Sequence, residues 1–142
     1  MSKSAIWRLA AATLVATLAL EGHAAAADPA ERVFFIEPKD GAEVTSPVKV
    51  VMGVEGMTIK PSGGVVAGTG HHHILINKGA MRGGKVIPTD ATHVHFGKGQ
   101  TEASLKLEPG DYTLTMQFAD GLHRSFGKKM AHSIKIKVLP AK

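Results

Sequence analysis

Five of the chain's eight histidines lie in two short segments, at positions 71–73 and 93–95. Both segments continue into β-branched or aromatic residues, which is typical of a strand that begins at a polar loop. Side chains alternate between the two faces of a strand, and residues two apart on one face are separated by about 7 Å. Each segment therefore places two imidazoles of a His-x-His pair on one face. If the two strands are neighbours, four imidazoles converge: His71, His73, His93 and His95.

The chemistry of such a group is metal binding. Neutral imidazole is the commonest protein ligand of zinc and copper(II), and a His-x-His pair presents two nitrogens at chelating distance. Two pairs predict an all-nitrogen site for copper(II) or zinc. His123 follows a predicted turn at Asp120-Gly121 and would complete the site if that turn lies against the two strands. The alternative is that these histidines are ordinary surface residues or bond to loop backbone.

The first segment also indicates which way its histidines face. His72 is in phase with Ile74 and Ile76. If those isoleucines enter a core, His72 is buried and bonded to a backbone group, whereas His71 and His73 point outward. In the second segment Asp90 could orient a histidine ring as a hydrogen-bond acceptor, or simply form a turn.

Other chemistry has less support. The chain contains no cysteine, which excludes thiol catalysis and thiolate metal sites. It has neither a Gly-x-Ser-x-Gly motif nor a phosphate-binding loop, so we do not expect an enzyme, although a metal with an open position would allow one. Its 17 basic and 12 acidic residues are spread along the chain, and aromatic residues are few. We therefore expect no nucleic-acid partner.

The N-terminus has the pattern of a secretory signal peptide. Lys3 and Arg8 precede an uncharged apolar run, Leu9–Leu20, and small residues follow at 24–27. The apolar run is too short to span a membrane. We expect a signal peptide at 1–27 and a single periplasmic or secreted domain at 28–142, with no membrane span after cleavage. An N-terminal membrane anchor is the alternative.

The elements that would position the histidines are short strands. The clearest is 112–118, where Tyr112, Leu114, Met116 and Phe118 alternate with polar residues. Further strands are expected at 33–36, 48–54, 57–59, 71–76, 93–96, 102–107 and 133–139. Glycine and proline turns separate them, and the pattern predicts an all-β, immunoglobulin-like antiparallel β-sandwich of about seven or eight strands. Lysines at 135 and 137 would protect an exposed edge of the last strand.

Several segments carry a family resemblance. They are Phe34-Phe35, Lys39–Ala42, Ser46–Val48, Gly68–Ile76, Ile87–Thr89, His93–Glu102 and Phe118–Gly121. Together they resemble a bacterial exported family catalogued as domain of unknown function 4399, over nearly the whole of 28–142. The family has no established activity. The resemblance implies that the glycine-containing segments 68–70 and 97–101 belong to the histidine region.

Two fainter resemblances point to copper. Three segments resemble the framework of CopC-type periplasmic copper-resistance carriers, namely Pro38–Ala42, Pro109–Leu114 and Ala119–His123, which implies a small immunoglobulin-like sandwich. Those carriers bind copper(II) through an N-terminal histidine and a histidine in an Asp-Gly-His turn. Here Leu122 is inserted before His123, and the expected N-terminus is alanine or aspartate. His93–Gly97 also resembles the first ligand pair of copper/zinc superoxide dismutases, without that family's cysteines or downstream spacing.

The sequence thus favours a metal-binding protein that sequesters or delivers copper(II) or zinc. The candidate ligands are His71, His73, His93, His95 and His123. The second hypothesis is a non-enzymatic cell-envelope interaction module. In that case the glycine-rich loops and basic surface would bind an envelope protein or an anionic polymer.

Overall fold

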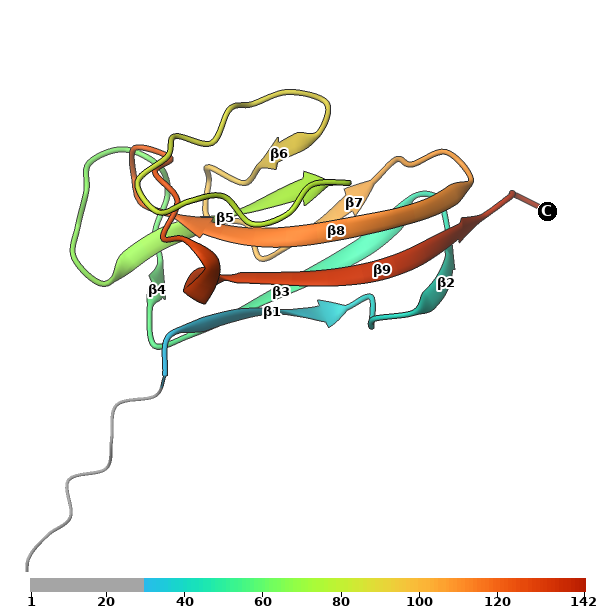
Figure 1. Cartoon of the computed structure of the whole chain (residues 1–142), viewed down its shortest axis with the longest axis horizontal. Coiled ribbons are helices and arrows are strands. Elements are labelled where there is room, and N and C mark those ends of the chain that lie inside the picture. The colour runs from blue at the N-terminus through green and yellow to red at the C-terminus, as the bar shows by residue number, and fades with distance from the viewer. Residues whose placement is uncertain (1–29) are drawn as a thin grey trace, which may run out of the picture.

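The computed structural model describes residues 30–142, and the predicted signal peptide lies outside the described residues. The described part of the chain folds into two packed β-sheets, which confirms the predicted all-β sandwich (Figure 1). Its strands are β1 (Arg32–Glu37), β2 (Ala42–Thr45), β3 (Val48–Glu55), β4 (Thr58–Ile59), β5 (Thr69–Ile76), β6 (His93–His95), β7 (Glu102–Leu105), β8 (Gly110–Ala119) and β9 (Ala131–Leu139). A short 3-10 helix, η1 (Lys128–Met130), precedes β9.

The smaller sheet has the order β1-β3-β7 and the larger one the order β2-β9-β8-β5-β4, with β6 also paired to β5. Most pairs are antiparallel as predicted, but β2 with β9 and β4 with β5 are parallel. Strand β2 was not predicted, because its four residues stand between a turn and Pro47. Since β2 pairs with β9, the last strand is not an edge, and the edge-protecting role expected for Lys135 and Lys137 is wrong.

The hydrophobic core lies between the two sheets. In β8 the alternation places Leu114, Met116 and Phe118 on the inner face, and all three are fully buried. They pack with inward residues of the facing sheet, including Phe35 and Val50. Burying a side chain of this size contributes about 1.5–3 kcal/mol, so this layer supplies most of the stability of a domain without disulfides.

The outer face of the larger sheet is also buried over β5 and the C-terminal half of β8, because loops cover it there, whereas the outward residues of β9 are exposed. The three loops are 60–68, 77–92 and 120–130. In loop 77–92, Lys78 O accepts a hydrogen bond from Thr115 Oγ1 (2.7 Å) and the Met81 N–H donates to Gln117 Oε1 (3.0 Å). Figure 1 shows this loop passing along β8 before it reaches β6. A polar second layer, which includes His71 and His73 of β5, is thereby closed off from water.

Gln117 is central to this polar layer, and its loss should be costly. Its amide nitrogen donates to Gly127 O (3.0 Å) and Met130 O (3.2 Å), in addition to the bond from Met81 N–H. Replacing Gln117 with leucine leaves these three backbone groups unpaired, at about 1–3 kcal/mol for each group that water cannot reach. We expect the free energy of unfolding to fall by about 3 kcal/mol or more in urea titrations.

Gln100→Leu is the matched control, since the side chain of Gln100 accepts a single exposed bond from Lys98 N–H. A change at Gln100 as large as that at Gln117 would contradict the importance assigned to the buried network.

Candidate metal centre

Four imidazoles meet on the outer face of the larger sheet. They belong to His71 and His73 in β5, His95 in β6 and His123 in the 120–130 loop, and one nitrogen from each lies within 4.8 Å of all the others. His71 Nε2 is 3.1 Å from His73 Nε2 and 3.1 Å from His123 Nδ1. The rings of His95 and His123 have centroids 4.5 Å apart. The nitrogens of the group are therefore nearly as close together as the ligands of one ion.

Strand pairing explains this convergence. In the antiparallel register of β5 and β6, His73 lies directly opposite His95. His71 is on the same face of β5 as His73, two residues earlier, and faces Ala119 at the end of β8. The 120–130 loop starts at the residue after Ala119, so it brings His123 to the group beside the histidines of β5 and β6.

The turn that carries His123 is held by Asp120. The Asp120 carboxylate accepts hydrogen bonds from Leu122 N–H (2.9 Å), Arg124 N–H (3.0 Å) and Arg124 Nε (2.7 Å). His123 has a φ of +64°, a left-handed conformation that is uncommon outside glycine. Its carbonyl accepts a bond from Ile87 N–H (2.8 Å). Contacts on both sides thus maintain an unfavourable backbone conformation that directs this histidine at the cluster.

Burial keeps the inner imidazoles neutral. His71 and His73 are fully buried, and desolvation, helped by repulsion from neighbouring imidazoles, lowers the pKa of His71 to about 4 and that of His73 to about 2. Burial also lowers the pKa of His95. Metal binding requires the neutral ring, so near pH 7 these side chains are already in the ligating form. His71 and His73 lie on the outer face of the sheet, as expected. They are not exposed to solvent, however, and in that respect the expectation is wrong.

Several ring nitrogens in the group lack partners. Buried nitrogens without a hydrogen bond include His71 Nδ1, His73 Nδ1 and His95 Nε2. An unpaired buried polar atom costs about 1–3 kcal/mol, and such atoms in a native fold need an explanation. A cation bound by the facing nitrogens would take one nitrogen from each ring, and for His71 and His73 the atoms in contact are the Nε2 atoms, so their Nδ1 atoms would stay unpaired. The donor set, four imidazoles with no carboxylate, suits zinc or copper(II) and is unsuited to calcium or magnesium.

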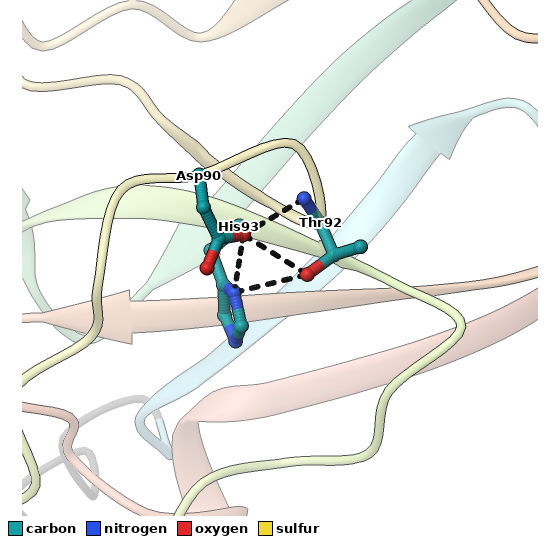
Figure 2. Close-up of polar contacts among 3 residues, drawn as sticks. All are labelled: Asp90, Thr92 and His93. Carbon is teal, nitrogen blue, oxygen red and sulfur yellow. Dashed lines mark hydrogen bonds and ion pairs between the residues drawn. The ribbon is translucent and has the colours of Figure 1, made fainter.

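His93 lies outside this group, although it was predicted to belong to it. In β6 it faces Leu75 rather than a histidine. Its Nδ1 is 2.8 Å from Asp90 Oδ1, which also accepts bonds from Thr92 N–H (2.8 Å) and Thr92 Oγ1 (3.0 Å), as Figure 2 shows. The hydrogen bond from His93 lowers the pKa of Asp90 to about 2. The structure thus brings together four of the five predicted residues and pairs the fifth with a carboxylate.

His72 points to the other side of β5. Its ring packs edge-on against Phe118, with centroids 5.1 Å apart, and is fully buried as predicted. The expected hydrogen bond to a backbone group is wrong, because both ring nitrogens are buried without a partner. Burial lowers the pKa of His72 to about 4.

Two residues that support the site were not singled out from the sequence as parts of it. One is Asp120, which holds the turn of His123. The other is Gly97, where an added Cβ would overlap the His95 ring. The only signal for Gly97 was its place in the glycine-containing segment that follows His95.

The fold and the histidine group together define a β-sandwich domain with a candidate all-imidazole metal centre. A family model described as domain of unknown function (DUF4399) matches residues 50–139, more than half of the chain, and the chain belongs to this family. No curated protein and no solved structure matches the chain. The family resemblance is confirmed, while the likeness to copper-resistance carriers stays a prediction. Within residues 30–142 no helix has the length and hydrophobicity needed to cross a membrane.

Proposed function

We propose that this protein is a periplasmic metal carrier that binds copper(II) or zinc through His71, His73, His95 and His123. The observation that carries this proposal is the convergence of four imidazole nitrogens within 4.8 Å at a place where burial disfavours protonation. Two nitrogens bound to one tetrahedral zinc are separated by about 3.3 Å, close to the 3.1 Å contacts of His71. Small ring movements would therefore suffice to admit an ion.

The number of ligands favours carriage over catalysis. Catalytic zinc sites keep three protein ligands and an open position for water or substrate, whereas sites with four protein ligands are closed. A closed centre suits sequestration or delivery of the ion.

The first test is a metal titration. The full chain is expressed, and the protein purified after export, with mass spectrometry locating the N-terminus that we expect after cleavage between residues 24 and 27. After chelator treatment, copper(II) and zinc are titrated while heat and melting temperature are followed. We expect one equivalent to bind with micromolar or tighter affinity and to stabilise the fold, by about 2.7 kcal/mol at a metal concentration of 100 times Kd. Weak binding of several equivalents without stabilisation would instead favour the envelope interaction module.

Gly97 offers a test of the geometry of the centre. In Gly97→Ala the new methyl group displaces the His95 ring, because the two would occupy the same space. We expect metal affinity to fall about tenfold or more, in the range seen when residues that orient ligands are lost. Competition with a chelating dye measures this change.

Gly79→Ala is the control for Gly97→Ala, since nothing lies within 4 Å of the added atom. If both variants bind metal as the parent does, His95 is not required at its observed position.

A further inference from the structure

The net positive charge of the described chain comes from one part of its surface. Residues 30–142 contain 15 basic and 10 acidic residues, an excess of five. The loops 60–68, 77–92 and 120–130 hold seven of the basic and two of the acidic residues, which is the same excess. The remaining residues, eight basic and eight acidic, are balanced. Both loop carboxylates are already engaged, Asp90 with His93 and Asp120 with Arg124.

Exposed aliphatic side chains gather on the same loops. Among the described residues five large hydrophobic side chains are exposed, and four of them are Val65 (51%), Val66 (47%), Val86 (61%) and Leu122 (53%). Exposed aliphatic side chains that gather in one region and are rimmed by polar or charged residues mark an interaction surface.

The three loops form one continuous surface, here called the loop surface. Gly63 N–H donates to Gly121 O (2.9 Å), which joins the first and third loops. Ser125 N–H donates to Lys85 O (2.8 Å) and Gly84 N–H donates to Ser125 O (2.8 Å), which joins the second and third. Figure 1 shows loops 60–68 and 120–130 side by side at one end of the sandwich.

We propose that the loop surface docks on an anionic phospholipid bilayer, with Val65, Val66 and Leu122 entering the interface and the lysines and arginines contacting headgroups. The like charges oppose pairing of this surface with a second copy of itself. The residues that dominate the energy of protein interfaces are enriched in Trp, Tyr and Arg, and the one Phe, Tyr or Trp in these loops, Phe126, packs against Phe118. A bilayer accepts aliphatic side chains anywhere along its interface and attracts basic residues to its anionic headgroups, so it needs no pocket shaped to fit this surface.

This proposal does not depend on a bound metal. It places Leu122 at the bilayer, and His123, the next residue, on the same side of the molecule. The half-buried edge of the histidine group would then face the membrane.

The test uses the exported, metal-free protein in co-sedimentation with vesicles. We expect binding to phosphatidylcholine vesicles that contain about 30% phosphatidylglycerol and none to pure phosphatidylcholine. About 0.5 M NaCl should weaken binding strongly, because it screens the charges. Each Lys or Arg near an anionic bilayer raises affinity about fivefold, so the triple variant Arg82→Glu, Lys85→Glu, Lys128→Glu should bind at least about 100-fold more weakly.

A matched control separates the surface from net charge. The triple variant Lys106→Glu, Lys135→Glu, Lys137→Glu makes the same charge change at exposed positions outside the loops, and we expect binding to change only a few-fold. Equal losses in the two triple variants, or no binding by the parent protein, would overturn the proposal. Circular dichroism checks that each variant is folded.

The aliphatic residues distinguish a bilayer from other polyanions. Val65→Ser, Val66→Ser and Leu122→Ser together should weaken vesicle binding about tenfold or more, since apolar insertion contributes in proportion to buried area. If this variant binds vesicles as tightly as the parent, the surface is a general polyanion site that would equally suit an acidic protein. The assignment to lipid would then be wrong.

Discussion

Replacing His95 with alanine is expected to abolish tight copper(II) or zinc binding, whereas replacing His93 with alanine is expected to preserve it. His95 lies opposite His73 and contributes one of the four clustered nitrogens. His93 lies two residues earlier on the same strand, but its Nδ1 is engaged by Asp90. Loss of a residue that merely orients a ligand costs 10–100-fold in metal affinity, so loss of a ligand should cost at least about 100-fold.

The two variants are well matched, because both remove an imidazole from the same face of β6. The His95→Ala variant should also lose less stability than the His93→Ala variant. His95 Nε2 is buried without a partner, so its removal eliminates an unpaired polar atom. Removal of His93 breaks a hydrogen bond and should cost more stability. Weaker metal binding by His95→Ala can therefore not be ascribed to general unfolding.

Chelator-competition titrations give the affinities, and melting curves without metal give the stabilities. Equal losses of affinity in the two variants would return His93 to the ligand set. Unchanged binding by His95→Ala would refute the four-histidine centre.

The metal-free protein is expected to lose stability steeply as pH falls from about 6.5 towards 4. Burial lowers the pKa of His71 and His72 to about 4 and that of His73 to about 2, from the ordinary histidine value of 6.5. Between these values the unfolded chain binds protons that the folded chain excludes, so acid favours unfolding. Each histidine changes the free energy of unfolding by at most about 1.4 kcal/mol per pH unit, so the three together change it by about 4 kcal/mol per pH unit. Domain stabilities are about 5–15 kcal/mol, so this loss can unfold the protein.

Melting temperature and urea titrations between pH 7.5 and 4 measure this effect. A bound ion holds the clustered rings in the neutral form, so saturating zinc should move the acid transition to lower pH until protons displace the metal. His72→Leu isolates the ring that faces the core. It removes one proton acceptor and two unpaired nitrogens, and should reduce the pH slope by about a third without affecting metal affinity. A melting temperature that stays constant across this range would contradict the assigned burial of these rings.

Much of the fold follows from local alternation. In β8 the sequence Tyr112–Phe118 alternates apolar and polar residues, and the inner residues Leu114, Met116 and Phe118 are those predicted. The same reasoning missed β2, which has only four residues and pairs in parallel with the distant β9. Such a strand is stabilised by a partner almost a hundred residues away, and its own sequence carries little signal.

For the site, local sequence established that His71 shares a face with His73, and that His93 shares a face with His95, because side chains along any strand alternate with a period of two. It did not establish which residue of one pair faces which residue of the other. That depends on the register of β5 against β6, which places His95 opposite His73 and His93 opposite Leu75.

Burial of the site and the position of His123 also depend on contacts between distant segments. The outer face of a sheet ordinarily meets water, and here its part over β5 and the end of β8 is closed because Gln117 and Thr115 bind the 77–92 loop. His123 joins the group because β8 ends opposite His71 and Asp120 shapes the following turn. Periodicity is a property of each strand's own backbone. Register and loop coverage result instead from the combined packing of the whole domain, so they appear only when the chain is folded.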